Sequence, residues 1–188
     1  MHRLLLVAAC ALPFSAAAAP LTITTEENPP LNFMDPTSHE VTGIATQVVK
    51  EVLEKAGVEY KIVLLPWQRA YQMALDGPTT CVYSTTITDE RKPLFKWVAP
   101  VTTNNWVLYS AADSDITLKS LEDAKPYKIG GYQGSAMGQF MIAQGYNIEI
   151  APQDVLNVNK LVAHHIDLWV TGERGGPVLA ERQGVVGL

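Results

Sequence analysis

From Leu21 onward, short β-branched runs alternate with longer stretches in which apolar residues recur at helical spacing. In the first half of the chain this pattern predicts strands over residues 21–24, 60–65 and 80–84. Helices are predicted between these strands, over about 42–57 and about 66–77. The order strand, helix, strand, helix, strand is typical of a parallel sheet with helices on its faces.

A polar run at 111–115 separates this region from a second one of the same kind. We therefore predict two α/β lobes, with lobe one over 19–110, including a strand at 106–109, and lobe two over 111–188. Within lobe two the pattern predicts strands over 127–130, 147–150 and 166–170, and helices over 135–144, 154–164 and 177–183.

The first residues have the organisation of a secretory signal. A basic residue precedes the apolar run 4–12, and small residues follow at 15–19. Cleavage after Ala18 predicts a signal peptide over 1–18 and an exported mature chain, because the apolar run is too short for a membrane anchor. A lipid-modified Cys10 is a less favoured alternative, since little apolar sequence precedes that cysteine.

The charge of the mature chain argues against two classes of partner. The full sequence has 14 basic and 19 acidic residues, and one of the basic residues, Arg3, lies in the signal, so the mature balance is 13 − 19 = −6. An acidic chain without a basic cluster disfavours nucleic acid and anionic membrane surfaces. Cleavage also leaves Cys81 as the last cysteine, which we expect to be a small buried apolar residue without a disulfide.

No residue set of this sequence predicts catalytic or metal chemistry. His164 and His165 are adjacent, so their side chains point apart on a helix and make a poor metal pair. Cys81 has no recognisable base, and no nucleophile elbow is present. We therefore expect no metal, no cofactor and no catalytic set.

The segment after the strand at 80–84 contains the most informative motif. Ser84 and Thr86 are followed by Arg91, and an aromatic segment ending at Pro100 comes next. Hydroxyls and turn amides suit the oxygens of a carboxylate, and a planar guanidinium can hold both oxygens at once. The alternative interpretation is an ordinary turn with a solvated arginine.

A glycine turn in lobe two leads from a strand into a helix, over residues 130–136. The amides at a helix N-terminus attract anions, and Ser135 is placed to cap that helix and to touch a ligand. A plain helix cap is the alternative. The lysine of a phosphate-binding loop is absent from this turn.

These two motifs together resemble the family 3 extracellular solute-binding proteins, which are periplasmic receptors of the polar-amino-acid type. The resemblance covers essentially residues 21–188. It implies an α/β, two-lobed, periplasmic-binding-protein-like (type II) fold. In that fold the chain returns from lobe two to lobe one, and the sequence ends about where that return would begin. We therefore expect an incomplete lobe one that exposes apolar surface and an unpaired strand edge.

The resemblance also implies roles for individual residues. Ser84, Thr86 and Arg91 match positions that hold the ligand's carboxylate in lobe one, and Ser135 matches a lobe-two contact. Trp67 matches a position that lines the ligand pocket. Asn28, next to Glu27, occupies the place in the loop after the first strand where an aromatic residue often stacks on the ligand.

One departure from the family's pattern concerns the ligand's ammonium group. Members that bind amino acids place an aspartate after the last lobe-two strand, and that place is Gly172 here. A desolvated ammonium without a counter-charge is costly. Glu173 and Glu27 are the expected substitutes, and the family's structural aspartate is Asp167.

The function that the resemblance implies is solute capture for an ABC importer in the periplasm. The solute is expected to carry a carboxylate, as in a polar amino acid or a relative, and the partners are that solute and an inner-membrane ABC permease. We expect a monomer. The leading alternative is an enzyme like cyclohexadienyl or arogenate dehydratase, with Glu173 as general acid. A sensor input domain without a transport role is the third hypothesis.

Overall fold

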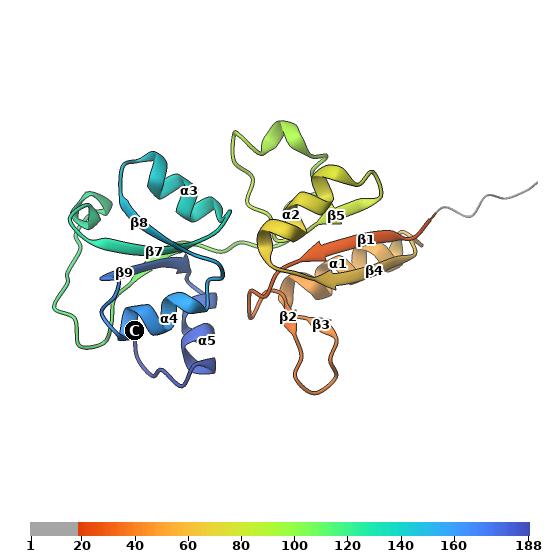
Figure 1. Cartoon of the computed structure of the whole chain (residues 1–188). Coiled ribbons are helices and arrows are strands. Elements are labelled where there is room, and N and C mark those ends of the chain that lie inside the picture. Colours follow the sequence, from red (N-terminus) through yellow and green to blue (C-terminus); the bar gives the residue numbers. More distant parts are fainter. Residues whose placement is uncertain (1–18) are drawn as a thin grey trace, which may run out of the picture.

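Each lobe is built around its own β-sheet. The computed structural model describes residues 19–188, so the predicted signal peptide lies outside the described residues. Figure 1 shows the two lobes side by side, the N-terminal half of the chain forming one lobe and the C-terminal half the other. In residues 19–188 no helix has both the length and the apolar character needed to cross a membrane. The predicted α/β, two-lobed architecture is confirmed.

Lobe one has a parallel sheet of three strands in the order β4-β1-β5. The strands are β1 (Leu21–Thr25), β4 (Tyr60–Leu64) and β5 (Thr80–Val82), and the helices are α1 (Ile44–Lys55) and α2 (Trp67–Asp76). A small antiparallel hairpin, β2 (Phe33–Met34) with β3 (Val41–Thr42), extends from this lobe, and the short 3-10 helix η1 (Lys92–Leu94) follows β5. The strand and helix order is the one that the hydrophobic pattern predicts.

The core of lobe one lies between β1 and α1, around the buried residues Ile23, Leu31, Ala45 and Tyr83. Gly43 precedes helix α1 as its N-cap, and its φ of 118° and close approach to the Leu31 carbonyl exclude a side chain. The apolar residues Ile44, Val48 and Val52 on the other side of α1 are exposed. Cys81 is also exposed, because β5 is an edge strand, so the prediction that it is buried was wrong.

Lobe two has a sheet of four strands in the order β6-β9-β7-β8. Its elements are β6 (Trp106–Tyr109), η2 (Leu121–Ala124), β7 (Lys128–Tyr132), α3 (Ala136–Ala143), β8 (Asn147–Ala151), α4 (Leu156–Val162), β9 (Leu168–Gly172) and α5 (Gly175–Arg182). Strand β6 runs antiparallel to β9, and the other neighbours are parallel. The strand at 106–109, which we assigned to lobe one, thus belongs to the second sheet, and the chain changes sheets before Trp106.

Strand β9 is the centre of lobe two, and all its residues are buried. One core cluster forms around Trp169 on the side of α4 and α5, and a second forms around Leu168 and Val170 with Met141 of α3. Helices on both faces of the sheet explain why every residue of β9 is buried.

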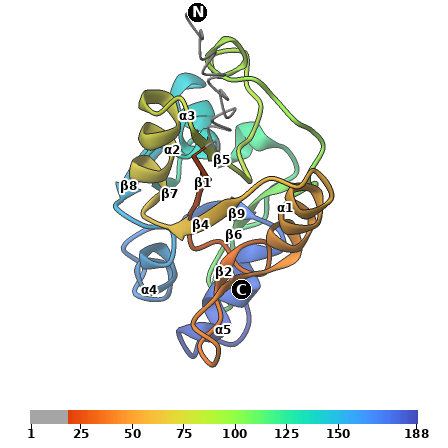
Figure 2. The same cartoon turned by 90° about the vertical axis from the view of Figure 1, so that its right-hand side faces the viewer.

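The carboxyl ends of the parallel strands in one lobe point toward the other lobe. Figure 1 shows the arrowhead of β1 directed at lobe two. Figure 2 views the molecule with lobe one in front, and α5 lies low in both views, near the β2–β3 hairpin. A side-chain contact joins these two parts, since the Arg182 guanidinium carbon lies 4.9 Å from the centre of the Phe33 ring.

Candidate functional site

Polar residues at the carboxyl ends of the strands meet where the two lobes touch. Glu26 follows β1, the loop 84–91 follows β5, and a turn containing Gly134 follows β7. Trp67 and Arg91 of lobe one both donate hydrogen bonds to the Gly134 carbonyl, each at 2.8 Å. In open α/β sheets ligands bind outside the carboxyl ends of the strands, so this contact region is the candidate site.

Arg91 is buried, with 6% of its surface exposed. Its Nη2 donates to the Gly134 carbonyl and its Nη1 donates to the Thr86 carbonyl at 3.5 Å. The guanidinium carbon lies 5.6 Å from the centre of the Trp67 ring and 5.1 Å from that of Tyr71. Among residues 19–188 no carboxylate forms an ion pair with Arg91. The alternative interpretation, in which Arg91 is a solvated arginine in an ordinary turn, is therefore wrong.

Trp67 begins helix α2 and is buried against the glycine turn of lobe two. A Cβ on Gly134, whose φ is 74°, would lie 3.2 Å from the Trp67 ring. The Trp67 ring packs on Tyr71 at 5.5 Å between ring centres. Trp67 therefore lies in the contact between the lobes, next to Arg91.

Ser84 and Thr86 differ in what they contact. Ser84 has a φ of 59°, and its hydroxyl donates to Asn32 Oδ1 at 2.5 Å within lobe one. Thr86 is exposed, and its carbonyl accepts the bond from Arg91. The structure thus brings Thr86 to Arg91, whereas the Ser84 side chain is held by Asn32. Their contact with a carboxylate stays a prediction.

Ser135 caps helix α3. Its Oγ accepts a hydrogen bond from the Gly138 backbone N–H at 3.0 Å, and the residue is 3% exposed. Ser135 therefore acts as a helix cap, which is the alternative interpretation given for it above. The residue directly follows Gly134, and its contact with a ligand stays a prediction.

Glu27 and Asn28 lie at the edge of the contact between the lobes. The exposed Glu27 carboxylate pairs with Arg182 of α5 at 2.6 Å and accepts from the Met34 backbone N–H at 3.1 Å. The Asn28 side chain lies against Gly175 of α5. The charge of Glu27 is thus already paired, which makes it a poor counter-charge for a ligand.

Glu173 and Gly172 follow the central strand of lobe two. The Glu173 carboxylate accepts from Asn105 Nδ2 at 3.0 Å, and its backbone carbonyl accepts from the Tyr109 hydroxyl at 2.9 Å. A Cβ on Gly172 would collide with the side chain of Asn104. Asn104 therefore fills the space that a side chain at position 172 would need.

Glu26 is the residue of this region that sequence reasoning missed. Its Oε1 accepts a hydrogen bond from the Tyr132 hydroxyl at 2.9 Å, which joins the end of β1 to the end of β7. Burial raises the pKa of the Glu26 carboxyl to about 8, against the opposing effect of the Tyr132 hydrogen bond. The signal available in the sequence was its position directly after the first strand.

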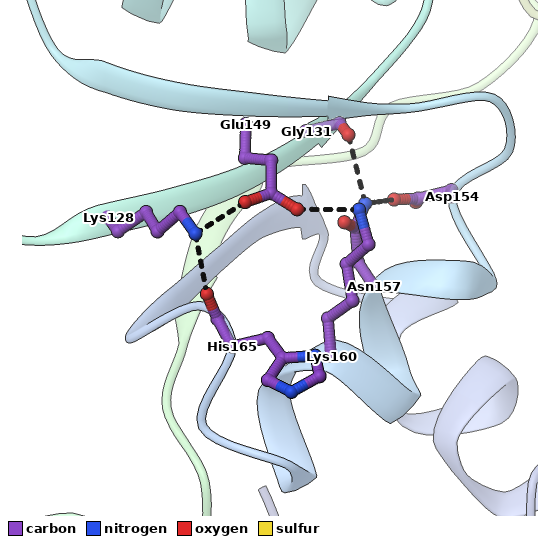
Figure 3. A network of polar contacts seen from close by, with 7 residues as sticks. All are labelled: Lys128, Gly131, Glu149, Asp154, Asn157, Lys160 and His165. Atoms are coloured by element: carbon purple, nitrogen blue, oxygen red, sulfur yellow. Dashed lines mark hydrogen bonds and ion pairs between the residues drawn. The ribbon is translucent and has the colours of Figure 1, made fainter.

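A second carboxyl, Asp154, lies after β8 in lobe two. It accepts hydrogen bonds from Trp169 Nε1 at 2.7 Å, from Thr171 Oγ1 at 2.6 Å and from Asn157 Nδ2 at 3.4 Å. Figure 3 shows Asn157 between this carboxylate and the Gly131 carbonyl. Burial raises the pKa of Asp154 to about 6, and the three donors oppose that rise.

A groove in lobe two lies apart from Arg91. This groove of about 390 Å³ has Trp106, Phe140 and Val170 in its walls, and all its lining residues follow the crossover into lobe two. No group of three or more His, Cys, Asp or Glu side chains in the described part of the chain has an arrangement that could hold a metal ion.

Comparisons with known proteins agree on the fold. A histidine kinase sensor domain with similarity to periplasmic binding proteins has a TM-score of 0.81 and 17% identity, over 88% of this chain and 73% of that chain. An ancestral arginine-binding protein bound to arginine has a TM-score of 0.74 and 22% identity, over 88% and 75%. The ancestral amino acid-binding protein AncCDT-1, a precursor of cyclohexadienyl dehydratase, has a TM-score of 0.71 and 22% identity, over 87% and 74%.

The family is shown by a match at the level of sequence. A comparison with curated proteins gives no match. The family model of bacterial extracellular solute-binding proteins, family 3, matches residues 21–162, which is more than half of the chain and includes both motifs. The chain therefore belongs to the bacterial extracellular solute-binding proteins of family 3.

Proposed function

We propose that this protein captures a small carboxylate-bearing solute between its two lobes, as the periplasmic component of an ABC importer. The observation that carries the proposal is Arg91, a buried guanidinium that forms no ion pair within residues 19–188. A buried charge without a partner is costly, and such a cost is retained where the charge serves to bind an anion.

A carboxylate suits Arg91 because of how the guanidinium is held. The Trp67 and Tyr71 rings lie against it, so its planar fork loses little freedom when an anion binds. Its present partners are neutral backbone carbonyls at 2.8 and 3.5 Å. A carboxylate would offer the same donors an ionised acceptor, so that both partners of each hydrogen bond carry a charge and two parallel bonds can form.

The solute would have to enter before the lobes close. The Gly134 carbonyl receives donors from both Trp67 and Arg91, so separating the lobes frees both donors at the same time. Motion of this kind is hinge bending, with residues 102–105 linking the lobe-one core at Val101 to strand β6. We propose a polar amino acid or a relative as the solute, an inner-membrane ABC permease as the partner, and a monomer in the periplasm.

The proposal is tested by ligand-induced thermal shifts with a panel of amino acids and small carboxylates. Arg91→Ala is expected to abolish the shift given by the best hit, and Arg91→Lys to weaken it, because an ammonium cannot bind a carboxylate in the same bidentate way. Arg69→Ala is the control, since Arg69 is an exposed residue of the same lobe, on helix α2. An unchanged shift in Arg91→Ala would overturn the carboxylate site.

A dehydratase-like enzyme is a second candidate, which one observation favours. Glu173, the acid that we expected for it, accepts a hydrogen bond from Asn105 in a partly exposed position. Glu26, with a pKa near 8, is a carboxyl that holds its proton at neutral pH in the candidate site. Loss of prephenate or arogenate with time, abolished in Glu26→Gln, is the result that this second function requires. If the protein bound prephenate or arogenate tightly without turnover, dehydratase activity on that compound would be excluded.

A further inference from the structure

Two loops of lobe one carry residues of the candidate site, and one side chain joins them. The loop between β1 and β2 contains Glu26 and Asn32, and the loop after β5 runs from Ser84 to Arg91. Asn32 is fully buried. Its Nδ2 donates a hydrogen bond to the Glu26 carbonyl at 2.7 Å, and its Oδ1 accepts one from the Ser84 hydroxyl at 2.5 Å. A single amide group thus holds both loops together.

The directions of these two hydrogen bonds follow from the groups that form them. A backbone carbonyl can only accept, so the NH₂ group of Asn32 must face Glu26, and its oxygen must face Ser84. The Ser84 hydroxyl has one proton, which is donated to Asn32. While this bond exists, the Ser84 side chain cannot donate to a solute's carboxylate, which is the contact that the family's pattern implies for it.

The backbone at Ser84 has a conformation that needs support. Its φ of 59° lies in the left-handed region, which is unfavourable for a residue with a Cβ atom. The chain leaves β5 through this residue, so φ at Ser84 sets the direction of the loop that follows. Two residues later the Thr86 carbonyl accepts from Arg91 Nη1 at 3.5 Å, and the Thr88 carbonyl accepts from the Arg91 backbone N–H at 3.1 Å. A change of φ at Ser84 would therefore move the loop that carries Arg91.

Asn32 is itself fixed by the fold of lobe one. Its backbone N–H donates to the Asn28 carbonyl at 3.0 Å, and its carbonyl accepts from the Asn28 N–H at 2.7 Å. The preceding residue, Leu31, belongs to the core of lobe one, and its carbonyl accepts from the Ala45 N–H at 2.9 Å. All these contacts lie within lobe one, so they do not depend on closure of the two lobes.

We propose that Asn32 is a positioning residue, which holds Ser84 in the left-handed conformation and so prepares the Arg91 loop for the solute before the lobes close. This inference rests on the proposed function, in which Arg91 binds a carboxylate. It adds that Ser84 acts through its backbone rather than through its hydroxyl. A loop that already has the binding conformation raises affinity, because the free protein does not have to reach a sparsely populated state before it binds.

Two substitutions of Ser84 distinguish this positioning role from a contact with the solute. Glycine adopts a positive φ without a steric cost and alanine does not, while both lack the hydroxyl. The probes are L-arginine and L-glutamine, titrated into the purified chain by calorimetry. We expect Ser84→Ala to weaken the tighter-binding probe by about 5- to 30-fold and Ser84→Gly to leave its affinity within about threefold of that for the unmutated chain. Equal losses in the two variants would mean that the hydroxyl binds the solute, and would overturn the proposal.

Asn32→Ala tests the other partner of the hydrogen bond. It is expected to weaken binding by about the same factor as Ser84→Ala, and the double variant Asn32→Ala with Ser84→Gly is expected to recover most of that loss. Tm should fall in both variants that lack Asn32, because the Glu26 carbonyl loses its donor. If Asn32 only stabilised the fold, Ser84→Gly would restore neither Tm nor affinity. Asn159→Ala, which changes an exposed asparagine of lobe two, is the control and should alter neither affinity nor φ at Ser84.

A third measurement needs no solute. A positive φ brings the amide proton of a residue close to its own Hα, so the nuclear Overhauser effect between these two protons is strong. NMR spectroscopy of the unmutated chain is expected to show this strong signal for Ser84, and the folded Asn32→Ala variant is expected to lose it. A positive φ at Ser84 that persists without Asn32 would overturn the proposal, whichever solute the protein binds.

The outcomes separate this positioning role from the proposed function. If binding is lost in Arg91→Ala but falls equally in Ser84→Ala and Ser84→Gly, the proposed function stands and the positioning role of Asn32 is rejected. If neither amino acid binds the unmutated chain, the proposed function fails for these two solutes. The NMR measurement then decides by itself whether Asn32 holds Ser84 in the left-handed conformation.

Discussion

The end of β1 in lobe one and the turn after β8 in lobe two each contain one half-buried carboxyl, and the two differ in how many hydrogen-bond donors the protein provides. Asp154 in lobe two has three hydrogen-bond donors, from Trp169, Thr171 and Asn157. Within the described part of the chain, Glu26 in lobe one has a single side-chain donor, Tyr132. Burial raises the pKa of both, to about 6 and about 8 respectively.

This difference separates a structural carboxyl from a functional one. Donors that belong to the same lobe replace the water that Asp154 loses, so the residue ties β8, α4 and β9 together. Glu26 lacks this replacement, and the one side-chain donor that it has among residues 19–188 belongs to the opposite lobe. A carboxyl that the fold leaves incompletely satisfied at the contact between two lobes is suited to a ligand.

Removing the satisfied carboxyl is the strongest way to break the comparison. Asp154→Ala leaves the buried Trp169 indole N–H and Thr171 hydroxyl without their acceptor, which we expect to cost about 2–4 kcal/mol in the free energy of unfolding. Urea denaturation at pH 7 measures this loss. Asp154→Asn keeps one acceptor oxygen and should lose less. If the alanine variant were as stable as the unmutated chain, the structural role of Asp154 would be rejected.

Removing the charge of Glu26 should increase the free energy of unfolding, whereas removing Asp154 decreases it. A carboxyl whose pKa is higher in the folded state than in the unfolded state lowers stability as the pH rises from about 4.5 to about 8. Glu26→Gln removes this penalty and keeps an acceptor for Tyr132, so we expect a gain of about 1–2 kcal/mol at pH 8 and little change at pH 5.

Thermal unfolding at the two pH values measures this gain. For a chain of this size, 1 kcal/mol corresponds to about 2–4 °C in Tm. Glu27→Gln is the matched control, because Glu27 is exposed and paired with Arg182, and we expect it to lower Tm slightly at both pH values. A Glu26→Gln variant that is less stable at pH 8 than at pH 5, relative to the unmutated chain, would contradict the assignment.

The same two carboxyls show what the sequence could predict. Strands, helices and the Arg91 motif were predictable because their signals are local: apolar spacing, turn residues and hydroxyls next to an arginine. Glu26 was not, because β1 is the central strand and its residues Ile23, Thr24 and Thr25 are all buried. With both faces covered, alternation cannot indicate whether Glu26 or Glu27 turns inward.

Long-range pairing explains the other differences. Strand β6 was assigned to lobe one by its position along the chain, whereas its partner β9 lies about sixty residues later, from Trp106↔Gly172 to Tyr109↔Trp169. The donors of Asp154 come partly from the same distant strand. The collision between Asn104 and a side chain at 172 is likewise a contact between distant residues, so the sequence could show that position 172 is a glycine but not what fills its space.

A third carboxylate sharpens the comparison with the smallest expected effect. Glu149 of β8 pairs with Lys128 at 2.6 Å and Lys160 at 2.8 Å, about a third of its side chain is exposed, and hydrogen bonds from both lysines lower its pKa to about 2 (Figure 3). A lowered folded-state pKa stabilises the fold above about pH 4.5, and that contribution is lost as the pH falls toward 2. Because the pairs are partly exposed, we expect Glu149→Gln to cost at most about 1 kcal/mol at pH 7. The cost should be smaller in high salt and should shrink as the pH falls below about 4.5.

Urea titrations at pH 7 and pH 3.5, each at low and high salt, measure this loss in the free energy of unfolding. A salt-independent loss as large as that of Asp154→Ala would mean that exposure does not decide how much a carboxylate contributes in this lobe, and the contrast between Asp154 and Glu26 would then need another cause.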